Sequence, residues 1–179
     1  EVDYKHQLIV ANEVTNVGHD RTHLARMAKR AKEAIGTASL EVVADRGYFK
    51  GEELRACEQA NITTFLPKPQ TSGNMAKGLF GKRDFIYDKE ADEYTCPGKQ
   101  RLVYHFTREE NGQVIRRYWS SACPYCELKP QCTTGVYRRV SRWEHEAVIE
   151  AAEQRLDQEP ERMRVRRSTV EHPFGTLKA

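Results

Sequence analysis

The first third of the chain alternates short apolar runs with segments of helical periodicity. Residues 7–14 (QLIVANEV), 39–44 (SLEVVA) and 62–66 (ITTFL) are apolar and rich in β-branched side chains, which is typical of strands. Residues 20–35 and 51–61 place apolar side chains three or four positions apart, as on one face of a helix. Strands that alternate with helices predict an α/β layer with parallel strands.

The middle of the chain, from residue 67 to about 140, has a different pattern. It contains no strongly amphipathic helical segment, and glycines and prolines interrupt it. Residues 101–107 and 114–120 have the composition of strands, and the polar sequence 109–112 between them predicts a β-hairpin. We therefore expect an inserted subdomain here and not a continuation of the α/β layer.

The last part of the chain is helical again. Residues 143–156 carry apolar side chains on one helical face, and Trp143 is expected to anchor this helix in the core. Residues 161–178 favour a further helix, interrupted or kinked near Pro173. The helical end therefore follows directly on the irregular middle.

Composition narrows the possible classes of protein. The chain has 179 residues, of which 39% are hydrophobic and 31% charged, with a formal net charge of +3. It has no apolar run of the roughly 20 residues that a membrane span needs, and no signal peptide is visible. The net charge is a mild hint of an anionic partner, and arginines crowd toward the last helices. The chain starts inside what resembles a strand, so we expect a segment of a longer protein.

Four of the five cysteines fall in the middle segment. Cys123 and Cys126 form a C-x2-C pair, Cys132 follows closely, and Cys96 lies on the other side of the expected hairpin. Without a secretory signal, metal ligation is favoured over disulfide bonding, and four thiolates favour tetrahedral Zn²⁺. The alternative is reduced cysteines packed as small hydrophobic side chains. Cys57 lies on the apolar face of its helix and is expected in the core.

Acidic side chains follow or precede the expected strands. Asp45 comes directly after the run 39–44, and ligands of open α/β sheets collect beyond the carboxyl ends of strands. A carboxylate there can hold a hard cation, whereas the alternative is a turn-forming aspartate. Asp3 could share such a metal if a strand ends at Val2; the alternative is a solvated terminal acid. Asp20 is expected to cap the helix that follows it.

Glu171 lies between cationic side chains near the end of the chain. Arg167 is four residues before it and Lys178 seven after it, so all three share one face of a helix. One interpretation is a metal-binding glutamate with cations that bind phosphate. The other is an ordinary solvated, charged helix face.

Several of these residues together resemble the signature of a known family. Asp45-Arg46-Gly47-Tyr48 after Val42-Val43-Ala44 resembles the "aDxGY" motif of bacterial insertion-sequence DDE transposases. Arg167, Glu171 and Lys178 match the R-x3-E-x6-K part of the family signature, although Arg164 stands where that signature has tyrosine. The sequence 170–175 (VEHPFG) is similar to the form of a cysteine-containing branch. Val2-Asp3 before the apolar residues 8–10 matches the position of the first acid.

The resemblance spans essentially the whole chain and implies a fold. It implies an α/β, RNase H-like mixed sheet flanked by helices, with an inserted cysteine-rich β-hairpin subdomain. Residues 1–66 would form the first part of the catalytic core, with its first strand truncated. Residues 67–140 would be an inserted, zinc-binding β subdomain, and residues 141–179 the helical end of the core with the third acid.

The resemblance also implies a function. It implies the catalytic domain of a DNA transposase, which uses Mg²⁺ or Mn²⁺ to cleave DNA strands and to join 3′-hydroxyl ends to target DNA. The ions would be held by Asp3, Asp45 and Glu171. DNA would be bound by Arg164, Arg166, Arg167, His172 and Lys178. The implied partners are transposon ends and target DNA, with a homodimer as the working complex and no membrane, in the bacterial cytoplasm.

Two other functions stay open at this point. One is a zinc-stapled DNA-binding remnant without catalysis, and the other is an RNase H-like nuclease that hydrolyses DNA without strand transfer. Basic residues at 138, 139 and 142, with Tyr137 and Trp143 between or beside them, fit DNA binding under each of these functions. A Mg²⁺-dependent cleavage assay separates the remnant from the enzymes, and strand-transfer products separate transposase from nuclease.

Overall fold

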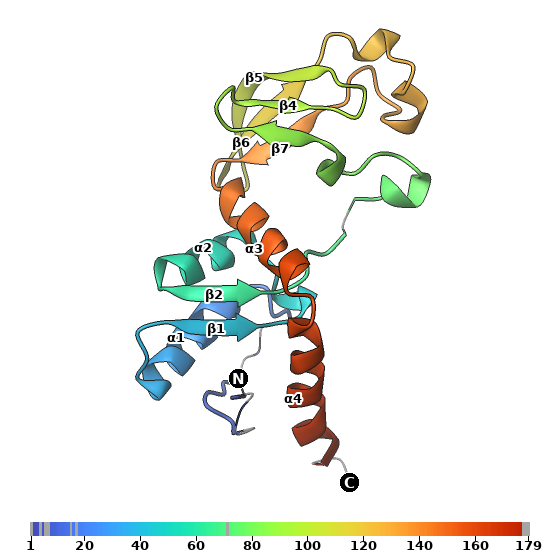
Figure 1. Cartoon of the computed structure of the whole chain (residues 1–179). Helices are drawn as coiled ribbons and strands as arrows, with labels where there is room; N and C mark the ends of the chain where they lie inside the picture. Colours follow the sequence, from blue (N-terminus) through green and yellow to red (C-terminus); the bar gives the residue numbers. More distant parts are fainter. Residues whose placement is uncertain are drawn as a thin grey trace. The chain divides into compact units, whose positions relative to one another are not determined.

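The chain folds into two compact units in a computed structural model (Figure 1). The structure describes all residues except 1, 4, 6, 7, 15, 17, 71 and 177–179, and it describes residues 170–176 by their backbone alone. Unit 1 consists of Glu1–Pro69 and His145–Ala179, and unit 2 consists of Gln70–Glu144. The chain is therefore a mixed α/β protein in which the second unit interrupts the first in sequence.

Unit 1 is built around a pair of parallel strands. Strand β1 (Leu40–Val43) pairs with β2 (Ile62–Phe65), and helix α2 (Gly51–Gln59) connects them. Helix α1 (Leu24–Ile35) precedes the strands, and helices α3 (Glu146–Gln158) and α4 (Arg162–Thr176) complete the unit (Figure 1). These ranges confirm the two helices and two strands that periodicity predicts between residues 20 and 66.

The core of unit 1 forms where the apolar faces of α1, α2 and α3 meet the strands. Leu24, Leu54 and Ala152 are almost fully buried there, and Cys57 is fully buried, as its place on the apolar face of α2 predicts. Helix α1 ends at Gly36, whose φ of 73° is a left-handed conformation that glycine adopts without strain. Burial of these faces therefore fixes which side of each helix faces β1 and β2.

The strand expected over residues 7–14 does not form among the described residues of that range. The described contact is a single antiparallel bridge between Val2 and Ile9. Leu8 and Ile9 are about two-thirds exposed, at 65% and 61%. An apolar, β-branched run becomes a strand only when a neighbouring strand accepts its backbone hydrogen bonds, and in the described residues β1 pairs with β2 alone.

Unit 2 is an antiparallel sheet whose strands follow one another in chain order. Its strands are β3 (Ile86–Asp88), β4 (Glu93–Thr95), β5 (Arg101–Glu110), β6 (Gln113–Trp119) and β7 (Val140–Trp143). Asn111 and Gly112 connect β5 to β6, both with positive φ, which is the conformation of a tight hairpin turn. Four short 3-10 turns lie outside the sheet: η2 (Met75–Lys77), η3 (Lys82–Asp84), η4 (Cys123–Tyr125) and η5 (Lys129–Gln131).

The sheet of unit 2 encloses an aromatic core. Tyr94 and Tyr118 are almost fully buried, with their ring centroids 5.3 Å apart. Both Tyr87 and Tyr118 donate hydrogen bonds from their hydroxyls to Asp92 Oδ1, at 2.6 and 2.7 Å. The phenol hydroxyls of this core therefore have a charged acceptor, which offsets the loss of water around them.

The structure corrects the expected start of the third helix. Trp143 is the last residue of β7 and not part of α3, which begins at Glu146. The backbone of β7 pairs with β6 from Tyr118 to Ile115, and Trp143 is buried in the strand with only 6% of its surface exposed. Tertiary pairing thus overrides the helical spacing that the sequence suggested. No helix in the described part of the chain is long and apolar enough to cross a membrane.

Candidate functional site

Asp45 lies just beyond the carboxyl end of β1, as the apolar run before it predicts. Its Oδ1 accepts a hydrogen bond from the backbone N–H of Gly47 at 2.8 Å and so caps the short 3-10 turn η1 (Arg46–Tyr48). A Cβ at position 47 would stand only 2.9 Å from that oxygen, so the turn favours glycine. With 43% of its side chain exposed, the carboxylate is fixed in direction but still reachable by a ligand.

Arg166 of helix α4 forms an ion pair with Asp45. Its Nη2 donates to Asp45 Oδ2 at 2.9 Å, across 121 residues of sequence. One turn earlier, Arg162 pairs with Glu41 Oε2 on β1 at 3.0 Å, and its guanidinium lies 4.7 Å from the ring centroid of Phe65 on β2. Two arginines spaced four residues apart thus attach α4 to the two strands, so α4 runs past the carboxyl end of β1 (Figure 1).

The structure describes less of the surroundings of Asp3 and Glu171, the other two acids of the predicted site. Asp3 Oδ1 accepts a hydrogen bond from the backbone N–H of Lys5 at 3.1 Å. Glu171 and His172 belong to the α4 backbone, but their side chains lie outside the described part, and Lys178 lies outside the described residues altogether. The convergence of Asp3, Asp45 and Glu171 on one site therefore stays a prediction.

The arginines around Glu171 differ in their surroundings. Arg164 and Arg167 are exposed, and Arg167 Nε reaches only its own helix, at 3.5 Å from the Met163 carbonyl. Arg166 is the arginine that contacts Asp45. The sequence predicts Arg166 as a DNA-binding residue but does not predict its ion pair with Asp45. The signal that could have revealed it is the Arg162–Arg166 spacing of four, which puts both side chains on one helix face.

Part of the expected basic patch before α3 is buried. Arg142 has only 9% of its surface exposed, donates to the Tyr94 hydroxyl at 3.2 Å and lies 3.6 Å from the Tyr87 ring centroid. Arg142 therefore belongs to the aromatic core of unit 2, which corrects the expectation of a DNA contact. By contrast, Arg139 is exposed and lies 5.4 Å from the Trp119 ring centroid.

The Asp45 carboxylate is a ligand of the kind that hard divalent cations bind. Carboxylate oxygens are the preferred ligands of Mg²⁺, and this carboxylate is accessible. Both of its oxygens already accept a hydrogen bond, one from Gly47 and one from Arg166, so a metal ion bound at Oδ2 would lie beside the Arg166 guanidinium. Within the described residues, no group of three or more His, Cys, Asp or Glu side chains is already arranged to hold a metal ion.

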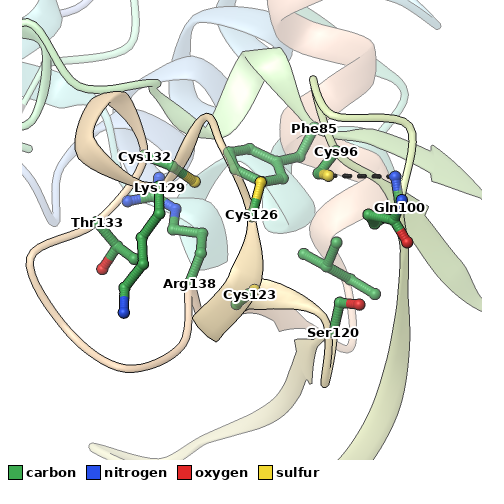
Figure 2. Close-up of a pocket in the computed structure, with 11 residues that line it drawn as sticks. Phe85, Cys96, Gln100, Ser120, Cys123, Cys126, Lys129, Cys132, Thr133 and Arg138 are labelled. Atoms are coloured by element: carbon green, nitrogen blue, oxygen red, sulfur yellow. Dashed lines mark hydrogen bonds between the residues drawn. The ribbon is translucent and has the colours of Figure 1, made fainter.

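The four cysteines singled out by their spacing line one pocket of unit 2. Its lining also includes Phe85, Leu102, Lys129 and Arg138, and Figure 2 shows the cysteines around it. All four cysteines are free thiols of intermediate exposure. Burial raises the pKa of the Cys132 thiol; the nearby Arg138 opposes this rise, and the other three cysteines add to it. Cys132 therefore lies close enough to the other three cysteines to be affected by their charge.

The comparisons with known proteins concern the second half of the chain. Residues 95–179, just under half of the chain, match the family model described as "Transposase DDE domain". The match runs from β4 through the hairpin and the clustered cysteines to α4, which includes Glu171. No curated protein and no solved structure matches the chain. The match supports a transposase of the DDE class, and with it an enzyme that acts on DNA.

Proposed function

We propose that the chain is the catalytic part of a DDE transposase with an RNase H-like core, which cuts DNA strands and joins them to a target. The observation that carries the proposal is the Arg166–Asp45 ion pair, because it joins the "aDxGY" segment to the helix that bears Glu171. These two segments hold the second and third acids of the family signature. The family match over residues 95–179 supports the same assignment independently of this contact.

In this proposal the three acids Asp3, Asp45 and Glu171 hold divalent cations, Mg²⁺ or Mn²⁺. The bound ions supply Lewis-acid stabilisation of the charge that develops on phosphate oxygens. The backbone N–H of Gly47 holds one oxygen of the Asp45 carboxylate, and Arg166 neutralises the carboxylate while no cation is present. The side chains that would bind DNA phosphates are those of Arg164, Arg166, Arg167, His172 and Lys178.

The proposed reaction has two phosphoryl-transfer steps. In the first, water attacks phosphorus at the transposon end, the bond from phosphorus to the 3′-oxygen breaks, and a 3′-hydroxyl is released. In the second, that 3′-oxygen bonds to a target phosphorus while the target's own 3′-oxygen leaves and takes up the proton. A homodimer that holds two ends together would perform both steps on the pair.

A cleavage and joining assay tests the proposal. The full-length protein is incubated with Mg²⁺ and a plasmid that carries the DNA from both sides of its own gene, with a second plasmid as target. We expect 3′-hydroxyl nicks at the element ends and covalent joints in the target. Cleavage without joints would indicate a nuclease of the same fold. Neither product from a folded protein that binds the DNA would overturn the proposal in favour of an inactive DNA-binding remnant.

A further inference from the structure

The connection between β6 and β7, residues 120–139, is long and largely irregular. It contains only the 3-10 turns η4 and η5 and no strand or longer helix. Several of its larger apolar side chains face solvent, including Tyr125 at 92% and Val136 at 59% exposed. A connection of this length without secondary structure of its own needs another source of order, since fixing its backbone costs conformational entropy.

The two turns place cysteines at their ends. Turn η4 begins at Cys123 and is capped by Cys126, whose backbone N–H donates to the Cys123 carbonyl at 3.3 Å. Turn η5 is capped by Cys132, which donates to the Lys129 carbonyl at 3.0 Å. Each of these 3-10 turns therefore ends at a cysteine whose backbone is held by a hydrogen bond within the turn.

The fourth cysteine comes from a tight turn between β4 and β5. Cys96 accepts a backbone hydrogen bond from Lys99 at 2.8 Å, and the N–H of Gln100 donates to Cys96 Sγ at 3.4 Å (Figure 2). A Cβ at Gly98 would lie 3.6 Å from Cys126 Sγ and 3.7 Å from Cys96 Sγ. The Sγ atoms of Cys96 and Cys126 thus both lie beside Gly98, which has no side chain to separate them.

Two cationic side chains, Arg138 and Lys129, line the pocket beside the four cysteines. The Nε atom of Arg138 is buried and has no hydrogen-bond partner among the described residues, although Arg138 lines the pocket. Buried N–H groups are normally satisfied, and a thiolate sulfur is an acceptor that this pocket can provide. Lys129 adds a second cation at the pocket. Four thiolates with one divalent cation leave a net negative charge, which these two cations offset.

We propose that Cys96, Cys123, Cys126 and Cys132 bind one structural Zn²⁺ ion that fastens the β6–β7 connection to the β4–β5 turn. Four thiolates complete a tetrahedral shell, so the ion has no open position for catalysis. Zn–S bonds of about 2.3 Å place the sulfurs about 3.8 Å apart. The described side chains do not yet form such a group, so binding turns the sulfurs inward. The proposal is independent of the DNA chemistry.

The metal itself provides the first test. The full chain, purified under reducing conditions, is analysed for zinc by mass spectrometry, and the zinc is examined by X-ray absorption. We expect stoichiometric zinc with sulfur as its only neighbours. Replacement by Co²⁺ should produce thiolate-to-cobalt charge-transfer bands of a tetrahedral site. Absence of stoichiometric zinc, or a shell dominated by nitrogen or oxygen, would overturn the proposal.

Cysteine variants test which residues bind the zinc ion. Cys123→Ser with Cys126→Ser should abolish zinc retention, whereas Cys132→His should keep a tetrahedral site with one nitrogen. Cys57→Ala is the matched control, because Cys57 lies in the core of unit 1 and should leave the zinc content unchanged. If the double variant does not fold, the absorption spectrum of the unmodified chain still decides the ligand set. Loss of transposition with zinc intact would count against the proposed function alone.

Discussion

Arg166 donates a hydrogen bond to Asp45 Oδ2 at 2.9 Å and so connects helix α4 to the carboxyl end of β1. The pair is neither buried nor fully exposed, with 21% of the Arg166 side chain and 43% of the Asp45 side chain accessible. A pair of this kind stabilises a fold by only about 0–1 kcal/mol. The contact is therefore better understood through what it holds in place than through its stabilising energy.

The first prediction concerns Asp45 itself. Asp45→Asn keeps the oxygen that caps η1 but removes the negative charge that a cation needs. We expect DNA cleavage and joining to fall at least roughly 100-fold, with the thermal unfolding midpoint nearly unchanged. Glu41→Gln is the matched control, because Glu41 is another acid on β1 that pairs with α4. Cleavage by Asp45→Asn at the normal rate would remove Asp45 from the active site.

The second prediction concerns the core of unit 1. Leu54 is 1% exposed and packs among the residues that join α2 to α1, α3 and the strands. Leu54→Ala should lower the free energy of unfolding by about 2–5 kcal/mol, because it removes buried apolar surface and leaves a cavity. Ile35→Ala, at a position 51% exposed, should change it by no more than about 0.5 kcal/mol. Urea denaturation followed by circular dichroism measures both.

The third prediction is a pH dependence that comes from unit 2. Although burial alone would raise the pKa of Asp92, hydrogen bonds from Tyr87 and Tyr118 and the charge of Arg116 hold it below its ordinary value. A carboxyl with a lowered pKa in the folded state stabilises the fold at neutral pH. That contribution is lost as the pH falls below about 4 and through the folded-state pKa.

Asp92→Asn tests this dependence with little disturbance of the backbone. Asp92 has a φ of 49°, a left-handed conformation that asparagine also tolerates. The drop in urea midpoint between pH 7 and pH 3 should be smaller in Asp92→Asn than in the unmodified chain, because the variant no longer has this carboxyl to protonate. Equal drops in both proteins would show that Asp92 carries no such linkage.

Local sequence patterns are sufficient to predict most helices and strands of unit 1. Helix α1 has its apolar stripe and a glycine at its end, and β1 and β2 are short β-branched runs that follow the polar residues Ser39 and Asn61. These features act within a few residues of one another, so a pattern along the chain can reveal them. The same reasoning placed Asp45 directly after a strand, which the structure confirms, whereas its role in catalysis stays a prediction.

Features that depend on distant pairing could not be predicted in this way. Strands β3, β4 and β7 are only three or four residues long, and partners in the sheet define them more than their own composition does. Trp143 has helical spacing to later apolar residues, yet pairing of β7 with β6 decides its conformation. The Arg166–Asp45 contact joins residues 121 positions apart, so it exists only once α4 has packed beside β1.

The last prediction separates two roles of Arg166. If Arg166 binds a DNA phosphate once a cation has taken its place at Asp45, Arg166→Ala should weaken DNA binding. It should also reduce the slope of log affinity against log salt by about one. Arg30→Ala, which removes a surface arginine of α1 that pairs with Glu13, should leave the slope unchanged. Binding is measured by fluorescence anisotropy on labelled end DNA over a range of salt concentrations. An unchanged slope in Arg166→Ala, together with a lower unfolding midpoint, would show that Arg166 serves only to attach α4 to β1.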